Sequence, residues 1–182
     1  MIRLRPAALS DVHALARLWH SSWHAGHAHL KEVQPCLLED RSLEIFAEQT
    51  PKHITNGGCH LIAEHVDGQL LGFASVESAE VTQIFVEPTV IGQGLVGVPL
   101  LSAAEALLLD VHGDGVVACV HALAANEKAC TFYRKHGWRE AGCIETKIET
   151  TIKRPGALHA VRFDHPWKQL RFEKQLSRQS AG

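Results

Sequence analysis

The sequence predicts a single domain of the α/β (α+β) class, built on a mixed sheet. A strand at residues 83–86, a loop with three glycines and a helix at 98–110 follow one another directly. An apolar run at 116–120 comes next, and a strand reached from another through a helix is most simply parallel to it. Two further runs, joined by Asp-Gly, predict an antiparallel hairpin. Parallel and antiparallel pairs therefore belong to one sheet.

Composition agrees with one globular domain. The chain has 182 residues, 46% of them hydrophobic, and about 100–200 residues per domain is usual. A net charge of -2 and a pI near 6.7 favour neither nucleic acid nor an acidic surface as partner. No apolar run reaches the roughly 18 residues of a membrane span, so we expect a cytoplasmic protein without membrane contact. Five scattered cysteines predict neither a disulfide framework nor a zinc site.

The first third of the chain predicts a strand and two helices. Residues 2–5 alternate apolar and basic side chains and precede a proline, as in a short strand. Ser10 and Asp11 supply an N-cap, and apolar residues then recur at helical spacing until Gly26 interrupts the pattern. Residues 37–49 favour another helix, and Thr50-Pro51 favours a turn.

The middle of the chain predicts a three-stranded meander. Residues 59–66 and 69–76 are joined by Asp67-Gly68, a pair suited to the positive φ angles of a type I′ turn. The strand at 83–86 follows within a few residues. Three antiparallel strands result.

The last third predicts a helix followed by two strands. Asn126 suits an N-cap, and Gly137 suits the position just after the helix C-terminus. Residues 142–152 alternate as in a strand, 154–167 predict a loop, and 170–176 predict a closing strand. Residues 177–182 are expected to form a frayed tail outside a domain spanning 1–176.

Residues 92–97, which we call the glycine loop, suit an anionic ligand. Gly92, Gly94 and Gly97 allow backbone N–H groups to approach a ligand closely, and the following helix adds partial positive charge at its N-terminus. Such a junction suits phosphate or pyrophosphate. A glycine-containing turn that binds nothing is the alternative interpretation.

At these residues the sequence resembles the GNAT superfamily of acyl-CoA-dependent N-acetyltransferases. In that family a strand ending Val-x-Pro is followed by Arg/Gln-x-x-Gly-x-Gly/Ala, whose amides hold the CoA pyrophosphate. Here the segment 86–88 and the first two glycines match, whereas Ile91 replaces the usual Arg or Gln and Val96 replaces Gly or Ala. One inserted residue before Gly97 would also account for the second difference. The departures bear on cofactor affinity more than on cofactor identity.

A second motif strengthens the resemblance. The family carries Asn-x-x-Ala-x-x-Phe-Tyr-x-x-x-Gly-Phe, and this chain has Asn126, Ala129, Phe132, Tyr133 and Gly137, with Trp replacing the last Phe. Both motifs stand in the family's order. The resemblance implies the GNAT acyl-CoA N-acyltransferase fold: a mixed, mostly antiparallel sheet of about six to seven strands flanked by helices, with splayed central strands forming the CoA cleft.

The resemblance also implies transfer of an acetyl group from acetyl-CoA directly to an amine acceptor. It places Tyr133 as proton donor to the departing thiolate, and it makes Tyr133 a cofactor contact as well. The further cofactor-binding residues that it implies are Ile84, Phe85, Val86, Gly92, Gln93, Gly94, Leu95, Val96, Gly97 and Asn126. A tyrosine that only packs on the sheet, and an asparagine that only caps its helix, are the structural alternatives.

The general base is predicted less sharply. Glu80 is the choice that the resemblance favours, because the family often places a glutamate at the start of this strand, and Glu77 and His121 are alternatives. His20, His24 and His27 follow i, i+4, i+7 spacing, yet no Cys or carboxylate joins them, so we expect no metal. Residues 23–30 are expected to line the acceptor side of the cleft.

Two functions of different classes remain open from the sequence. One is the N-acetyltransferase, acting on a small-molecule or peptide amine. The other is an acyl-CoA-binding or regulatory module that keeps the fold without turnover, suggested by Ile91 and Val96. The sequence does not specify the acceptor. The resemblance allows a homodimer, but no residue in the sequence fixes an interface.

Overall fold

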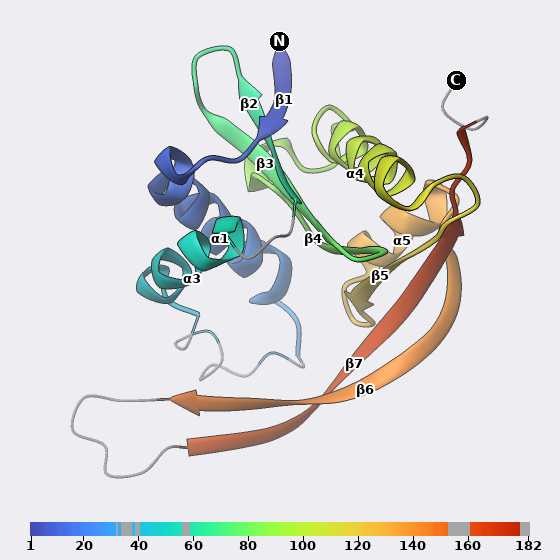
Figure 1. Ribbon diagram of the computed structural model, residues 1–182. Helices are drawn as coiled ribbons and strands as arrows, with labels where there is room; N and C mark the ends of the chain where they lie inside the picture. The colour runs from blue at the N-terminus through green and yellow to red at the C-terminus, as the bar shows by residue number, and fades with distance from the viewer. Residues whose placement is uncertain (32, 34–37, 39–40, 56–58, 153–160, 179–182) are drawn as a thin grey trace.

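The computed structural model describes residues 1–31, 33, 38, 41–55, 59–152 and 161–178 (Figure 1). The strands are β1 (Ile2–Pro6), β2 (Cys59–His65), β3 (Leu70–Glu77), β4 (Glu80–Val86), β5 (Val117–Leu123), β6 (Arg139–Ile152) and β7 (Val161–Gln175). The helices are α1 (Val12–His27), α3 (Leu43–Thr55), α4 (Gly97–His112) and α5 (Glu127–Lys135), and short 3-10 turns lie at Leu9–Asp11 and Pro88–Val90.

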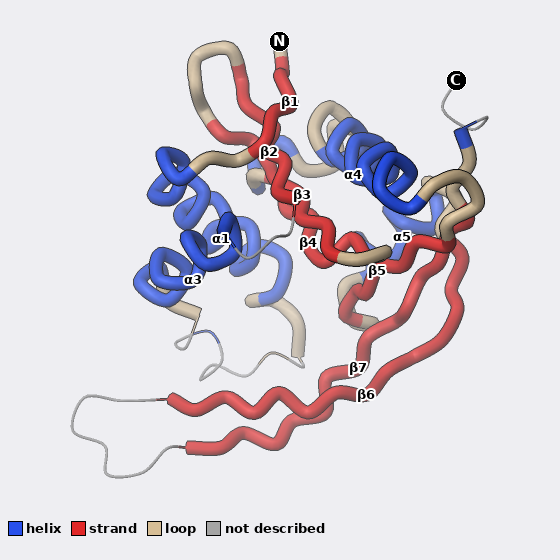
Figure 2. Tube along the Cα trace, in the orientation of Figure 1, coloured by secondary structure: helices blue, strands red, loops and turns tan. Residues whose placement is uncertain are grey.

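All seven strands form one sheet, in the order β1-β2-β3-β4-β5-β7-β6. Every neighbouring pair is antiparallel except β4 and β5, which run parallel on either side of helix α4 in the chain. The predicted mixed, mostly antiparallel sheet and the predicted parallel pair are confirmed. Figure 2 shows the sheet passing between two pairs of helices, α1 with α3 and α4 with α5.

The parallel pair is short. Strands β4 and β5 are paired only at Glu80↔Cys119 and Val81↔Val120, and beyond these residues they diverge. Residues 84–86 of β4 therefore keep backbone groups on the β5 side that no strand satisfies. A ligand chain can take the place of the missing strand there.

The sheet carries a hydrophobic core on each face. On the α4 and α5 face, Leu100, Ala104 and Leu108 of α4 pack against alternate residues of β2 to β5 and against Tyr133. On the other face, Trp19 of α1 and Phe46 of α3 pack on the sheet. Figure 1 shows α1 and α3 on one side of the strands and α4 and α5 on the other.

A third, small core joins the β6–β7 hairpin to the end of α1. Trp167 of β7 and Leu123 of β5 bury Leu30 and Val33, and Trp23 packs at the edge of this group. The hairpin then continues past the rest of the molecule, beneath α1 and α3 as drawn in Figure 1.

Two predicted helix boundaries are wrong. Gly26 does not interrupt the first helix, because α1 continues through it to His27. The second helix does not stop at Thr50-Pro51, because α3 runs on to Thr55 with Pro51 inside it. Because Pro51 has no N–H, the carbonyl of Ala47 loses its helical donor, and in the preceding turn the hydroxyl of Thr50 donates to the carbonyl of Phe46 (2.7 Å).

Asp11 occupies the predicted N-cap position of the first helix, but its side chain makes no cap hydrogen bond with α1. Its carboxylate instead accepts from the N–H of Ala8 (2.8 Å), at the start of the 3-10 turn before α1. The helical run thus begins one turn earlier than the prediction.

The hairpin between β2 and β3 is confirmed, but its turn is not type I′. Only Gly68 has a positive φ (92°), and its N–H donates to the carbonyl of His65 (2.9 Å). This is the pattern of an ordinary turn followed by a left-handed glycine, the next most common hairpin connection. Asp67 accepts from the N–H of Gln69 instead of adopting a positive φ.

The predicted loop at 154–167 extends too far toward the C-terminus. Strand β7 begins at Val161, and β6 begins at Arg139, three residues before its predicted start. Pro166 lies inside β7, opposite Lys147 of β6. Strand β5 pairs with β7 only from Gln169 onward, so Pro166 faces a free edge, where a missing N–H breaks no ladder. Residues 153–160 lie outside the described part of the chain.

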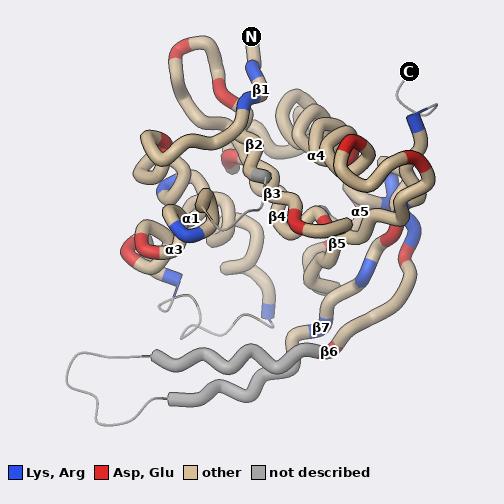
Figure 3. The backbone as a smooth tube through the Cα atoms, viewed as in Figure 1, with Lys and Arg blue, Asp and Glu red and all other residues tan. Residues whose placement is uncertain are grey.

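Charged residues of both signs are interspersed along the chain, as Figure 3 shows for the described residues. No helix of the described part is both long enough and apolar enough to cross a membrane.

Candidate active site

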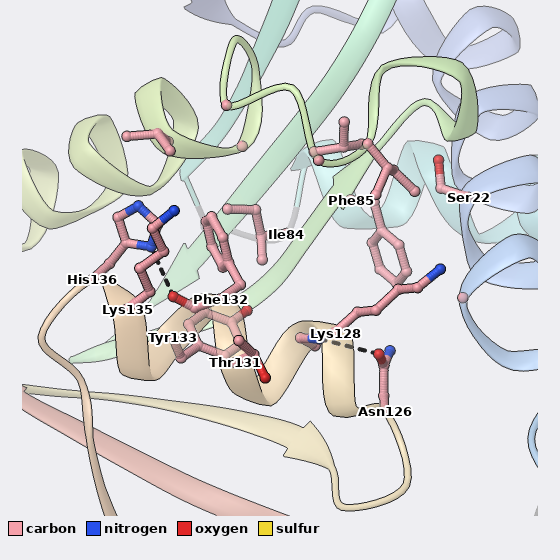
Figure 4. Close-up of a pocket in the computed structure, with 18 of the residues that line it drawn as sticks. Ser22, Ile84, Phe85, Asn126, Lys128, Thr131, Phe132, Tyr133, Lys135 and His136 are labelled. Carbon is pink, nitrogen blue, oxygen red and sulfur yellow. Dashed lines mark hydrogen bonds between the residues drawn. The ribbon is translucent and has the colours of Figure 1, made fainter.

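A pocket of about 400 Å³ opens where β4 and β5 diverge. Residues of α1, β4, the glycine loop and α5 form its wall (Figure 4): Ser22, Gly26, His27, Ile84, Phe85, Val86, Val90, Ile91, Gly92, Gly94, Gly97, Val98, Asn126, Lys128, Ala129, Thr131, Phe132, Tyr133, Lys135 and His136. The wall is therefore mainly apolar, with a few polar groups, as ligand sites usually are.

The glycine loop has the conformation that the sequence predicts. Gly92 and Gly94 have φ of 82° and 72°, and a Cβ on either would meet no atom within 4 Å. Both glycines are exposed, and neither N–H donates to another backbone group of the described residues. Gly97 begins α4, so the positive end of that helix also lies at the pocket.

Eight of the predicted cofactor-binding residues line the pocket: Ile84, Phe85, Val86, Gly92, Gly94, Gly97, Asn126 and Tyr133. Three do not. Gln93 bends back to the carbonyl of Thr89 (3.1 Å), and Leu95 is exposed. Val96 is buried in the core, and a Cβ on Gly72 would lie 2.8 Å from it, so Val96 supports the loop from below.

Helix α5 forms the opposite wall. The side-chain oxygen of Asn126 accepts from the N–H of Ala129 (3.1 Å), as the predicted N-cap requires, and its amide nitrogen is left for another acceptor. Phe132 and His136 follow along the same side of the helix, with His136 bonded to the carbonyl of Phe132 (2.7 Å; Figure 4).

Tyr133 is at once part of the core and part of the pocket wall. Its ring packs against Trp138 and Phe172 at centroid distances of 6.1 and 5.7 Å. Burial raises the pKa of Tyr133 well above its usual value, so the hydroxyl keeps its proton. No other protein group of the described residues bonds this hydroxyl, which leaves it available to a ligand in the pocket.

The predicted bases lie elsewhere. Glu80 stands where β4 and β5 still pair, and its carboxylate bonds Nδ1 of His121 (2.8 Å). Neither residue lines the pocket, and Nε2 of His121 is enclosed without a partner. The structure thus joins two of the predicted candidates in one pair but sets them apart from the pocket wall. Glu77 ends β3 and also stays outside it.

Sequence reasoning missed most of the polar wall. Lys128, Thr131 and Lys135 follow i, i+3, i+7 spacing on α5, and this spacing could have placed the three on one face of that helix. Ser22, Gly26 and His27 come from the end of α1, and Gly26 and His27 fall in the region 23–30 expected at the acceptor side. Their approach to α5 depends on tertiary packing, which no local pattern reports.

The described residues contain no group of three or more His, Cys, Asp or Glu arranged to hold a metal ion. Two of the histidines at helical spacing are bonded to carbonyl oxygens: His24 to that of Arg41 (2.8 Å) and His27 to that of Trp23 (2.7 Å).

The splayed parallel strands, the glycine loop and the pocket between them define the GNAT N-acetyltransferase fold, and solved structures agree. A GCN5-related N-acetyltransferase from Rhodopseudomonas palustris superposes with a TM-score of 0.72 at 22% identity, over 96% of this chain and 95% of that chain. The PaiA N-acetyltransferase from Thermoplasma acidophilum, in complex with coenzyme A, gives 0.65 at 17% identity, over 97% and 99%. The yncA protein from Salmonella typhimurium, with its cofactor acetyl-CoA, gives 0.64 at 16% identity, over 98% and 95%.

No family model and no curated protein matches the sequence. The resemblance first seen in two short motifs is therefore confirmed at the level of the fold, by structures that share less than a quarter of their residues with this chain.

Proposed function

We propose that this protein is an N-acetyltransferase that transfers the acetyl group of acetyl-CoA directly to an amine. The observation that carries the proposal is the pocket itself, which lies between the unpaired edge of β4 at residues 84–86, the glycine loop and α5, and which has Tyr133 in its wall. Those parts match the needs of the reaction: a place for a pyrophosphate, a channel for an extended thiol arm and a proton source.

The pocket fits the acyl donor in several ways. The accessible amides at Gly92 and Gly94, with the N-terminus of α4, suit the pyrophosphate. The unpaired backbone of residues 84–86 suits the amides of the pantetheine arm. Lys128 and Lys135 line the same pocket and can pair with phosphate oxygens.

Tyr133 is proposed as the general acid. The C–S bond breaks more easily when the departing sulfur receives a proton, and a positioned acid contributes about 10²–10⁴-fold. Its raised pKa keeps Tyr133 protonated at neutral pH, and the apolar packing around the ring fixes its position. Glu80 as the base stays a prediction from the resemblance.

The structural neighbours support this donor. One of them was solved with coenzyme A and another with acetyl-CoA. The alternative, a binding module without turnover, rests on Ile91 and Val96. Since Val96 is buried beneath the loop, only Ile91, which lines the pocket and is half exposed, replaces a polar contact.

Calorimetry with acetyl-CoA, followed by release of free CoA in a panel of amines, tests the proposal. We expect saturable binding and then amine-dependent CoA release. Absence of binding at millimolar acetyl-CoA would refute both functions, and binding without release for any amine would favour the module.

Two glycine variants locate the binding site. Gly94→Ala and Gly68→Ala each force alanine into a positive φ, at a cost of about 1–2 kcal/mol, and neither Cβ meets a neighbour. Only Gly94 lies at the pocket. We expect weaker acetyl-CoA binding, by about tenfold, in Gly94→Ala alone.

A further inference from the structure

His27 is the one histidine from α1 in the pocket wall, and its tautomer is fixed. Its Nδ1 lies 2.7 Å from the carbonyl oxygen of Trp23. A carbonyl can only accept, so Nδ1 carries the hydrogen, and in a neutral ring Nε2 then holds a free lone pair.

The plane of the ring is fixed as well. The indole of Trp23 lies nearly parallel to the imidazole, with 4.7 Å between centroids and 13° between planes. Trp167 of β7 is also nearly parallel, at 6.3 Å and 18°. The hairpin and α1 therefore hold His27 in one orientation, as pre-organised groups in active sites are held.

Nε2 of His27 is open to a ligand. It has no bonding partner among the described residues, and it is not one of the enclosed unpaired atoms, which are Ser22 Oγ, Arg41 Nε and His121 Nε2. The ring lines the pocket beside Ser22, whose own hydroxyl is enclosed. This end of the pocket thus offers the Nε2 lone pair, which no group of the described residues uses.

The surroundings keep the imidazole neutral. Burial lowers the pKa of His27 below its usual value, and the basic groups near it lower it further: His24 of α1, and His29 and Arg41 of the chain between α1 and α3. From α5, the ammonium group of Lys128 lines the same pocket, and no carboxylate of the described residues does. A neutral imidazole is the form that can accept a proton.

We infer that Nε2 of His27 is the proton acceptor for the amine, in place of Glu80. The inference rests on the proposed function. As the amine nitrogen bonds to the acetyl carbon, the C–S bond breaks. The nitrogen gives one proton to His27 Nε2, and Tyr133 gives its proton to sulfur. Water then returns the proton from His27 to Tyr133, so the products are the amide and free CoA.

Two variants test the inference through activity. His27→Phe keeps an aromatic ring between the indoles but has no lone pair, and His27→Gln checks that the result does not depend on phenylalanine. With spermidine, phenethylamine and Ala-Ala-Ala as amines, we expect kcat/KM to fall about 10²–10⁴-fold in both variants, with unchanged acetyl-CoA affinity. His20→Gln, on the same helix but outside the pocket wall, should lose less than about threefold.

The pH profile separates a base from a merely structural histidine. When the rate is expressed per concentration of neutral amine, which removes the ionisation of the substrate itself, wild-type kcat/KM should be flat near neutral pH and fall as His27 becomes protonated, at a pH below the usual histidine pKa of about 6.5. The His27 variants should lose that fall. Retained activity and an unchanged acid limb in His27→Phe would overturn the inference, as would loss of the acid limb in Glu80→Gln alone.

Nitrogen NMR of the histidine side chains gives a second readout that needs no turnover. We expect the His27 ring of the wild-type protein at pH 7.5 to be neutral, with hydrogen on Nδ1. A protonated ring, or hydrogen on Nε2, would overturn the inference even if none of the three amines is acetylated. Failure of acetylation with the expected tautomer would instead count against the proposed function.

Discussion

The two faces of the sheet bury different kinds of residue. On the α4 and α5 face the core is apolar apart from Tyr133. All the buried polar residues of the described chain lie on or beside the α1 and α3 face: Asp11, Ser22, Thr50, His60 and Ser75. Most are paired, as when Nδ1 of His60 bonds the hydroxyl of Ser75 at 2.6 Å.

Because of this difference, the two faces of the sheet are expected to contribute differently to the pocket. Apolar packing on one face fixes the glycine loop and Tyr133 without reference to pH. The other face contains the histidines whose pKa values burial lowers and, with Ser22 and His27, the part of the wall where an acceptor is expected. Donor binding and acceptor chemistry should therefore respond differently to mutation and to acid.

The largest expected effect is on catalysis, from the apolar face. Tyr133→Phe removes one hydroxyl that has no bonding partner among the described residues, so the packing of the ring should survive. We expect kcat to fall about 10²–10⁴-fold while the melting temperature and acetyl-CoA affinity change little. Turnover and thermal melting measured on one preparation decide the point, and full activity would remove Tyr133 from the mechanism.

A substitution in the packing beneath the glycine loop should lower stability more than a substitution in the pocket wall. A Cβ on Gly72 would lie within 3 Å of Val96, Leu100 and the carbonyl oxygen of Phe85, so Gly72→Ala should lower the free energy of unfolding by about 1–3 kcal/mol. In Gly97→Ala the nearest contacts are at 3.6 Å, and stability should be kept. Because Gly97 lines the pocket, that variant should instead weaken acetyl-CoA binding. Denaturant unfolding measures the stability of both variants, and calorimetry measures their affinity for acetyl-CoA. Equal destabilisation of the two variants would contradict the expected difference.

Acid should destabilise the protein through the α1 and α3 face. Burial lowers the pKa values of His20, His27, His53 and His60, so between their folded values and about 6.5 the unfolded chain binds more protons. Stability is then complete above about pH 6.5 and is lost as pH falls through the folded pKa values. Melting temperatures from pH 8 to 5 should decline, and less steeply in a His53→Gln, His60→Gln double variant. A melting temperature that rises on acidification would exclude this explanation.

The smallest expected effects come from ion pairs. Asp11 accepts two bonds from Arg5, both at 2.8 Å, in a partly buried setting, so Asp11→Asn should cost about 1–2 kcal/mol. Lys52 and Glu48 pair at 3.2 Å on the exposed side of α3, and Glu48→Gln should cost about 0.5 kcal/mol or less. Urea unfolding of the two variants gives both values, and a larger loss in Glu48→Gln would reverse the assigned order.

The sequence patterns correctly predicted the features that depend on residues close together in the chain. The strand, glycine loop and helix around residues 83–110, the cap at Asn126 and the parallel pair are all present. Wrong predictions arose where tertiary contacts override propensity. Pro51 lies inside α3, which packs on α1, and Gly26 lies inside α1 with Asn126 beside it, 3.9 Å from the position of a Cβ.

The candidate site was half predictable for the same reason. Its donor half comes from two contiguous motifs, whereas Ser22 and His27 reach the pocket only after α1 packs across the sheet. Nothing in the sequence reports that Trp167 lies beside His27, because 140 positions separate the two residues. That contact also helps to hold the His27 ring in the orientation that its proposed role requires.

The two paired positions between β4 and β5 have a mechanical consequence. At these two positions, which we call the seam, strands β1–β4 pair with strands β5–β7. One further hydrogen bond, from the N–H of Cys119 to the carbonyl of Ala79, lies beside the seam. We expect each half of the sheet to open as its own cooperative unit, with amide exchange faster at the seam than within either half. A ligand that contacts both diverging strands would connect the two halves of the sheet. Its binding should therefore slow amide hydrogen exchange in both halves together.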